Sequence, residues 1–413
     1  MNSYVKLALE GGTPIRQEPF PKRKPFGSEE IKLVTEAIES QNLFYTEGNK
    51  TTQFEKEFAK KYGVKNAVAC SSGTASVHMA IAALDLSPGD EVITAPVTDY
   101  GTIAGMLFQG VIPVFADWKE NTFTMDPEDI ERKISERTKA IVVVHLFGNP
   151  CDMDAIMDTA NRHHLKVIED CCQAYFTYYN ENLCGTIGDI GCFSMQQSKH
   201  MTAGEGGVVI TNDENLAMRA GLFRDKGWEN RYKWGPRYYS FLGINYRMND
   251  LTGAVALAQL GKVEKTVDTM NKLGDYLTEC IKDIPGIIPA PVTKGGRHSY
   301  WLYTIKFVDY EAVNFVQALV AENIPFGWGY TVDPIYLCTD ALTKKRTFGQ
   351  SSYPFDSEYY SKNVEYKEGL CPVAEKELKM LGTLRIYENW TKEDIDDVAK
   401  AIRKVANRLK EKL

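Results

Sequence analysis

Short apolar runs alternate with helical stretches from about residue 66 onward. Five runs rich in β-branched residues, bounded by small or polar residues, predict strands over residues 66–70, 90–95, 112–117, 139–147 and 166–170. Between the first two, four apolar residues share one helical face: Val77, Ala80, Ile81 and Leu84. Strands alternating with helices are typical of a mainly parallel sheet between helices. Ligands of such sheets gather beyond the carboxyl ends of the strands, so the strand-terminal residues are the candidates for chemistry.

A second region begins near the helical stretch 251–265 and has fewer strands, such as residues 299–307. Thr391 and Asp394 predict a capping pair before a final helix, whose apolar stripe is Ile395, Val398, Ile402, Val405 and Leu409. A chain of 413 residues exceeds what one core usually organises. We therefore expect an α/β protein with a large domain over residues 1–255 and a smaller C-terminal α+β domain over residues 256–413. The first 27 residues, rich in Pro and Lys, are expected to wrap over the surface.

Composition and charge narrow the class of protein. The net charge is −7 and the basic residues are scattered, which argues against a nucleic-acid partner. No window of eighteen apolar residues and no signal-peptide pattern stands out, so we expect a soluble cytoplasmic protein without a membrane partner. The nine cysteines form no metal-like pairs, which favours reduced, mostly buried thiols and no metal site.

The segment around Lys199 is the first candidate for chemistry. The chain has no G-x-x-x-x-G-K-[ST], no G-x-G-x-x-G after a strand, no G-x-S-x-G and no H-E-x-x-H. Lys199, in contrast, lies between a β-rich run and a cluster of glycines at 204, 206 and 207. A lone lysine is usually a solvated surface residue, but ordered backbone on both sides favours a lysine held at a defined point.

Two further features join Lys199. Asp170 ends the run 166–170, where it could meet a ligand or simply cap a helix. Residues 71–74, with the sequence SSGT, join a strand to a helix, where free N–H groups favour an anion. Pyridoxal phosphate chemistry needs a lysine, a carboxylate against the pyridine nitrogen and a phosphate cradle. The three features together predict a site for pyridoxal 5′-phosphate (PLP).

Over nearly its whole length the chain resembles the DegT/DnrJ/EryC1/StrS family of PLP-dependent sugar and cyclitol aminotransferases, which have the aspartate-aminotransferase fold. The segments that carry the resemblance include LALEGGTPIR, SSGTASVHMAIAALDLSPGDEVIT, VVVHLFGNPCDMD, VIEDCCQA, FSMQQSKHMTAGEGG, LGINYRMNDLTGAVALAQL and YENWTKEDID. The resemblance implies that the large domain binds PLP. It also implies that Lys199 forms the Schiff base and moves the proton, that Asp170 faces the pyridine nitrogen, and that Gln173 contacts the ring hydroxyl oxygen.

The resemblance also implies how the phosphate is held. Gly73 and Thr74 match the phosphate-binding turn, and Ser194 matches a serine whose hydroxyl reaches the phosphate. Asn245 matches an asparagine that reaches the phosphate across a subunit boundary, although by itself it reads as a turn residue. The match at Asn245 implies a homodimer with shared active sites.

Three positions depart from the family pattern. Relatives commonly stack an aromatic residue on the cofactor ring where this chain has Asp99, so either Tyr100 or another side chain must cover the ring. Tyr175 replaces a histidine and would alter the substrate face. Some members carry histidine in place of the lysine and are sugar dehydratases; here Lys199 is present, and its neighbour His200 is expected to have a local role.

The expected reaction is therefore transamination. L-glutamate or L-glutamine, with a slight preference for glutamine, would load the cofactor as pyridoxamine 5′-phosphate (PMP), which would aminate the ketone of a sugar, often nucleotide-linked, or of a cyclitol. Such a reaction belongs to amino-sugar or aminocyclitol biosynthesis, for an antibiotic or a polysaccharide. The alternatives are a PMP-assisted dehydration of a keto-sugar and a non-catalytic regulator that only binds PLP.

Overall fold

The fold was analysed in a computed structural model, which describes residues 6–229, 235–360 and 364–410. A seven-stranded sheet forms the centre, in the order β1-β9-β8-β5-β4-β2-β3. All neighbours are parallel except β9, which runs antiparallel to both β1 and β8. The bounds are β1 Asn66–Cys70, β2 Glu91–Thr94, β3 Ile112–Phe115, β4 Thr138–Val144, β5 Lys166–Asp170, β8 Ile190–Ser194 and β9 Gly207–Thr211. The predicted α/β class with a mainly parallel sheet is confirmed.

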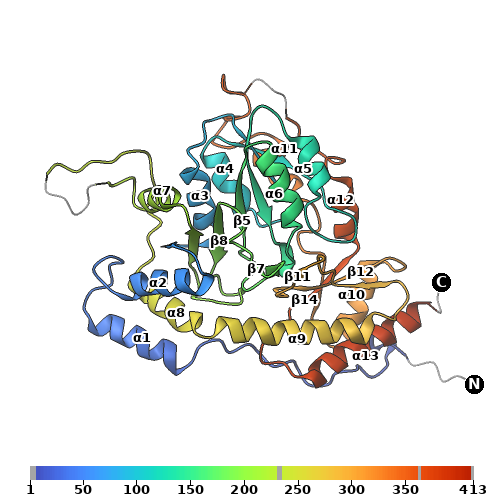
Figure 1. Ribbon diagram of the computed structural model, residues 1–413. Coiled ribbons are helices and arrows are strands. Elements are labelled where there is room, and N and C mark those ends of the chain that lie inside the picture. Colours follow the sequence, from blue (N-terminus) through green and yellow to red (C-terminus); the bar gives the residue numbers. More distant parts are fainter. Residues whose placement is uncertain (1–5, 230–234, 361–363, 411–413) are drawn as a thin grey trace, which may run out of the picture.

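Helices cover both faces of this sheet (Figure 1). Three of them pack together on one face: α3 Gly73–Ala83, α4 Gly101–Phe108 and α7 Glu214–Arg224. The opposite face carries α5 Pro127–Lys133 and α6 Met153–Arg162. Beneath the sheet lie α1 Ser28–Glu39, α2 Lys50–Tyr62, α8 Asp250–Leu260 and α9 Val263–Ile281. The strands of this sheet and α3 are largely buried, because both sheet faces are covered.

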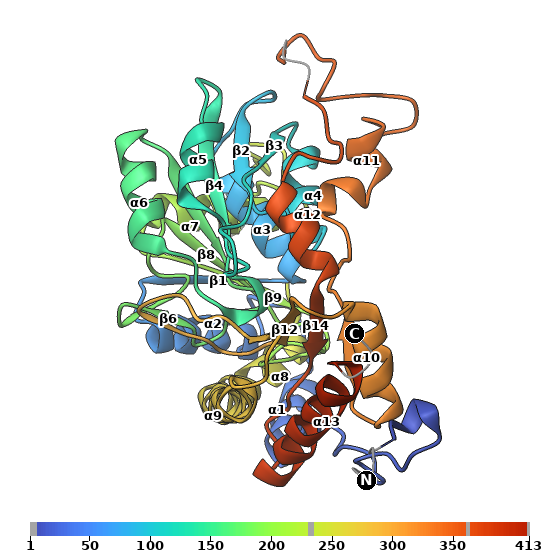
Figure 2. The ribbon, with the colours of Figure 1, turned by 90° about the vertical axis from the view of Figure 1, so that its right-hand side faces the viewer.

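A second, antiparallel sheet has the order β10-β12-β14-β13 and lies between α9 and α10 (Figure 2). The strands of this sheet are β10 Ile287–Pro289, β12 Tyr303–Phe307, β13 Phe326–Trp328 and β14 Leu381–Leu384. The helices α10 Ala312–Ala321 and α13 Lys392–Lys410 belong to the same region. These elements enclose a separate apolar core that includes Leu277, Phe307, Phe315 and Ile402. The shorter elements are β6 Tyr178–Tyr179, β7 Asn182–Leu183, β11 Gly296–Arg297, α11 Asp340–Thr343, α12 Pro372–Lys379, and the 3₁₀ turns Ala8–Glu10, Leu146–Gly148 and Ile335–Leu337.

Chain order and spatial grouping differ in the C-terminal region. Leu342 and Leu378, of α11 and α12, belong to the core of the large sheet and not to the second core. The sequence-based division between residues 255 and 256 falls inside α8 and stays a prediction.

Local sequence signals near the C-terminus have mixed outcomes. The capping pair is confirmed, since Asp394 Oδ2 accepts from the Thr391 N–H at 2.8 Å and Thr391 Oγ1 accepts from the Asp394 N–H at 3.3 Å. The strand expected over residues 299–307 is shorter than predicted and begins at Tyr303. Tyr300 has a left-handed φ of 50°, which breaks the extended run and leaves Trp301 in a loop before the strand. In the described part of the chain no helix combines the length and apolar character needed to cross a bilayer.

Candidate active site

A cavity of about 360 Å³ opens where the parallel strands end. Its walls include residues that follow β1, β2 and β5 and the last residues of β4 and β8. Six of the residues expected from the sequence to hold PLP line it: Gly73, Thr74, Asp170, Gln173, Ser194 and Lys199. The strand-terminal location predicted for the site is therefore where the structure brings these six residues together.

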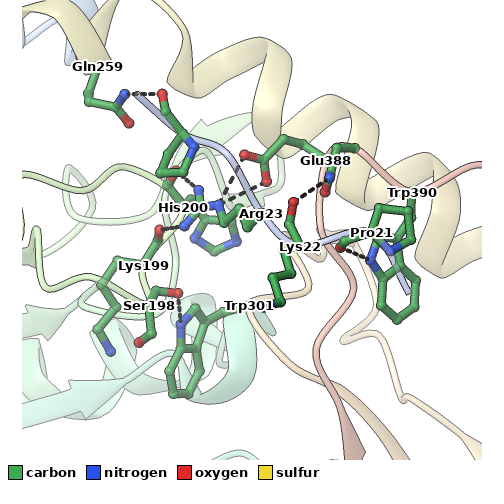
Figure 3. Close-up of polar contacts among 12 residues, drawn as sticks. Pro21, Lys22, Arg23, Ser198, Lys199, His200, Gln259, Trp301, Glu388 and Trp390 are labelled. Atoms are coloured by element: carbon green, nitrogen blue, oxygen red, sulfur yellow. Dashed lines mark hydrogen bonds and ion pairs between the residues drawn. The ribbon is translucent and has the colours of Figure 1, made fainter. Parts of the chain in front are cut away.

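Lys199 lies in the irregular segment between β8 and β9, with 9% of the residue exposed. Its Nζ lies 4.1 Å from the centre of the Trp301 ring, and the Trp301 indole N–H donates to the Ser198 carbonyl at 3.0 Å (Figure 3). Burial lowers the pKa of the Lys199 amine below its usual value, while Cys172 and Asp170 act to raise it. The amine is thus a desolvated nucleophile at the edge of the cavity.

Asp170, the last residue of β5, is held in a fixed orientation by donors on both carboxylate oxygens. The Thr102 hydroxyl donates to Oδ2 at 2.8 Å, and the Cys172 N–H donates to Oδ1 at 3.0 Å. Thr98 lies four residues before Thr102, in the bend that precedes α4, and their hydroxyl oxygens are 2.6 Å apart. The Cys172 contact is a local turn between residues i and i+2, and no helix begins after Asp170 in this described stretch of chain, so the helix-cap alternative is wrong and Asp170 is a residue of the cavity wall.

Gln173 is fixed at both ends of its amide. Its Oε1 accepts from the Phe147 N–H at 2.8 Å, and its Nε2 donates to the Tyr330 hydroxyl at 3.2 Å. One Nε2 proton remains for a ligand, because an amide nitrogen has two. The side chain is therefore presented to the cavity in one orientation.

The first turn of α3 and the end of β8 approach each other closely enough to require glycine. A Cβ on Gly73 would lie 2.5 Å from the Cβ of Ser194 and 2.8 Å from its Oγ. Ser72 caps the helix by accepting from the Ala75 N–H at 3.0 Å. The N–H groups of Gly73 and Thr74, which have no acceptor within the helix, remain for an anion, favoured also by the helix dipole.

The departures from the family pattern have structural outcomes. Asp99 lines the cavity and accepts from the Gly101 N–H at 2.8 Å, whereas Tyr100 does not line it and is 39% exposed. The aromatic side chains of the wall are instead Trp301 and Tyr330. The expectation that Tyr175 alters the substrate face is wrong, because its side chain is fully buried in the core of the large sheet.

His200 has a local role, as expected. Burial lowers its pKa to about 3, and its Nε2 lies 2.9 Å from the Ser299 carbonyl oxygen. The imidazole is therefore neutral at pH 7 and donates to that carbonyl.

Asn245 is the one expected cofactor residue that does not line the cavity. It is exposed, and its Oδ1 accepts from the Arg247 N–H at 3.3 Å. This position leaves the expected reach across a subunit boundary as a prediction.

Sequence reasoning missed several wall residues, and three of them, Trp301, Tyr330 and Arg385, come from the C-terminal region. These residues have no motif around them in the sequence. Tryptophan, tyrosine and arginine are common in any chain, so their residue types alone do not indicate a site. The Arg385 guanidinium lies 5.1 Å from the Trp301 ring and, within the described residues, makes no hydrogen bond or ion pair.

A buried trio of His145, Glu169 and Cys184 has ligand atoms within 4.8 Å of one another. Glu169 nevertheless accepts from the N–H groups of Gly185, Ile187 and Gly188 and from His145. The other imidazole nitrogen, Nδ1, accepts from the Cys151 N–H. Because hydrogen bonds already occupy these lone pairs, the trio is a structural network and not a preformed metal site.

These contacts fit PLP in kind and in place. The cavity has an amine that can bond an aldehyde, a carboxylate held by two donors, an oriented amide, and a cradle that a Cβ at Gly73 would fill. The fold is that of PLP-dependent aminotransferases of the aspartate-aminotransferase type, and these residues would hold the cofactor.

Comparison with known proteins gives the family. The model of the DegT/DnrJ/EryC1/StrS aminotransferase family matches residues 25–403, and the chain belongs to this family. The enzyme is thus a PLP-dependent aminotransferase, and its relatives include proteins named as aminotransferases of an inosose and of a UDP-linked sugar.

Two relatives and one solved structure illustrate the likeness. GDP-perosamine synthase of Caulobacter vibrioides is 38% identical over 305 residues, 71% of this chain and 81% of that protein. A putative L-glutamine:3-amino-2,3-dideoxy-scyllo-inosose aminotransferase of Micromonospora echinospora is 32% identical over 417 residues, 98% of each chain. An aminotransferase from Psychrobacter cryohalolentis superposes with a TM-score of 0.82 at 29% identity, over 95% of this chain and 99% of that one.

Proposed function

We propose that this aminotransferase moves an amino group from L-glutamine or L-glutamate to the ketone of a cyclitol or of a sugar, including a nucleotide-linked sugar. The main support is the single cavity that contains the Lys199 amine, the Asp170 carboxylate and the N-terminus of α3. A regulator that only binds PLP would not need a desolvated lysine in position to move a proton.

Each residue around the cavity has a distinct proposed role. When bound, PLP supplies an electron sink that weakens the Cα–H bond of an attached amino acid. Lys199 would hold the cofactor through its amine, and the same amine, when free, would be the base that carries the substrate proton. Its lowered pKa suits this role, because a larger fraction of the amine is then neutral and able to accept a proton. Asp170 would hold the proton of the pyridine nitrogen, and the Gln173 amide proton that makes no hydrogen bond within the described residues would be available to the ring hydroxyl oxygen.

The phosphate would be held by the first turn of α3 together with Ser194. The N–H groups of Gly73 and Thr74 supply donors that a helix cannot use internally. The Ser194 hydroxyl lies beside Gly73, and it can donate to a phosphate oxygen from there. This arrangement accounts for the phosphate group without any cationic side chain in the cradle.

Arg385 supports an amino-acid donor. It is a cavity cation with no described ion pair, and a guanidinium binds a carboxylate in a bidentate manner. The name of the Micromonospora relative specifies L-glutamine and an inosose, which favours glutamine and a cyclitol. The name of the Caulobacter relative specifies a GDP-linked sugar, so a nucleotide-linked acceptor remains the second candidate.

Absorption spectroscopy of the PLP-loaded protein tests the reaction. Addition of L-glutamine, and separately of L-glutamate, should convert the PLP band to the PMP band with release of the matching keto acid. Lys199→Ala and Lys199→Arg should both abolish this conversion, and the arginine variant shows whether positive charge alone is sufficient. A wild-type spectrum that neither donor changes would contradict the proposed donors. A deoxy product with ammonia release would establish dehydration instead of transamination.

We further propose a homodimer with shared active sites. Asn245 is exposed outside its own cavity, and nearby Leu242 is 91% exposed, as expected of residues that a second copy covers. Mixing equal amounts of Lys199→Ala and Asn245→Ala chains tests this. Each hybrid dimer would regain one intact site, and because about half of the dimers are hybrids, the mixture should have about a quarter of the wild-type activity. No recovery in a demonstrated hybrid would place both residues in one chain's site. The cytoplasmic location stays a prediction, which cell fractionation would test.

A further inference from the structure

Residues 21–25 form a strap of irregular chain. The strap passes next to residues 195–203, which contain Lys199 and are called the lysine segment below (Figure 3). Because it belongs to no helix or sheet, its carbonyl groups need donors from elsewhere. Three side chains supply them: Trp390 Nε1 donates to the Pro21 oxygen at 3.3 Å, Asn389 Nδ2 to the Lys22 oxygen at 2.9 Å, and Gln259 Nε2 to the Pro25 oxygen at 2.8 Å. The strap is thus fixed on both sides of Arg23.

Arg23 reaches from the strap to the backbone of the lysine segment. Its Nη1 donates to the Lys199 carbonyl at 2.7 Å, and its Nη2 donates to the His200 carbonyl at 2.7 Å. Its Nε donates to the Glu388 carboxylate at 3.0 and 3.1 Å. The side chain is largely buried, with 9% exposed, and all three guanidinium nitrogens make hydrogen bonds; Figure 3 shows it between Glu388 and the segment.

The two carbonyls that Arg23 contacts lie in irregular chain, outside any helix or strand. Including the Trp301 contact to Ser198, three successive carbonyls, 198 to 200, accept hydrogen bonds from side chains outside the segment. Two of the three bonds come from Arg23. One guanidinium therefore holds the carbonyls of both Lys199 and His200, while the Lys199 N–H donates to the Gln196 carbonyl at 2.9 Å.

We infer that Arg23 is a positioning residue for Lys199, with Glu388 orienting the guanidinium. Arg23 does not line the cavity; it fixes the backbone so that the amine stays at the Trp301 face of the cavity. This inference rests on the proposed function, because it concerns the lysine that bonds PLP and moves the proton. Misplacement of a reacting group by about 1 Å can cost about 100-fold in rate, so an anchor on this peptide has leverage.

Another arginine of the N-terminal segment provides a matched control. Arg16 pairs with Asp394 of α13 at 2.7 Å and, like Arg23, is largely buried, with 12% of its side chain exposed. It connects the same N-terminal segment to the same C-terminal region but makes no contact with the lysine segment. A general loss of strap stability should therefore affect both positions alike.

The experiment compares two ligands that share one cavity. PLP bonds covalently to Lys199, whereas PMP carries an amine and binds without that bond. Arg23→Lys keeps a charge beside Glu388 but cannot reach both carbonyls. We expect it to bind PMP within about twofold of wild type, and to form the covalent Lys199–PLP band at least about tenfold more slowly. Arg16→Lys should change neither quantity. Hydrogen exchange of residues 195–203 should rise in the Arg23 variant alone.

Two outcomes would overturn the inference: equal losses for PLP and PMP, which indicate a merely structural ion pair, or no loss for either. If Arg23→Lys folds poorly, the double variant Arg23→Met with Glu388→Met removes the pair without leaving an unpaired charge, and should show the same selective loss. A wild-type protein that forms no covalent PLP band at all would refute the proposed function itself, and this inference with it.

Discussion

Replacing Gly73 by alanine tests the phosphate cradle most directly. The new Cβ would lie 2.5 Å from the Ser194 Cβ, 0.9 Å short of the 3.4 Å at which ordinary contact begins. It would also lie 3.2 Å from the Cys172 Sγ, so the helix cannot avoid the clash by a small sideways shift. The first turn of α3 must therefore move away from the end of β8.

The magnitude follows from the position of this clash. Forcing an extra carbon into a packed site costs about 1–3 kcal/mol. Because the clash separates the two groups proposed to hold the phosphate, we expect most of that cost to appear as lost affinity. At about 1.4 kcal/mol per factor of ten, the dissociation constant for PLP should rise about 5- to 150-fold.

The assay is an absorption titration of cofactor-free protein with PLP and, in parallel, with pyridoxal, which lacks the phosphate. Only the PLP curve should shift in Gly73→Ala. Gly221 in α7 is the control, since a Cβ there meets nothing within 4 Å. Gly221→Ala should leave both titrations unchanged and stabilise the helix by about 0.5–1 kcal/mol. An unchanged PLP titration in Gly73→Ala, or an equal loss for pyridoxal, would refute the cradle.

Three further predictions concern activity, acid stability and packing. Thr102→Val removes the hydroxyl that donates to Asp170 at 2.8 Å and should lower turnover about tenfold, whereas Thr102→Ser should retain it; equal turnover of both variants would contradict this. Burial lowers the pKa of His78 to about 4, so the unfolded chain binds the extra proton first and stability should fall as the pH drops from about 6.5 towards 4. His78→Gln should reduce that slope by about 1.4 kcal/mol per pH unit in urea unfolding at several pH values, unless the imidazole is already charged in the folded state. Ile402→Ala in the fully buried stripe of α13 should cost about 2–5 kcal/mol by urea denaturation, and a loss below 1 kcal/mol would argue against that packing.

Local signals in the sequence determined much of the large domain and half of the site. Alternating β-rich and helical runs predicted β5 with its observed bounds and placed Asp170 at its carboxyl end. The SSGT sequence predicted the strand-to-helix turn, and the Thr391–Asp394 pair predicted the start of α13. Each of these features depends on residues only a few positions apart, so both partners of the interaction can be read from one short stretch of sequence.

Family resemblance extended this to residues that have no local signal. Gln173 and Ser194 would have been read as ordinary polar residues without it, yet both line the cavity. Asn245 shows the limit of the same reasoning, because its proposed role depends on a second copy of the chain.

Only the tertiary structure decided what surrounds Lys199. Arg23 is 176 residues away along the chain, and Trp301 is 103 residues from the Ser198 carbonyl to which it donates. The run 299–307 read as one strand, and the left-handed φ of Tyr300 alone turned Trp301 out of it. Apolar periodicity tells which face of an element is buried, but not which distant segment covers it. The lysine itself could be read from the sequence, whereas the anchor of its backbone and the wall facing its amine depended on how the chain ends fold back over the sheet.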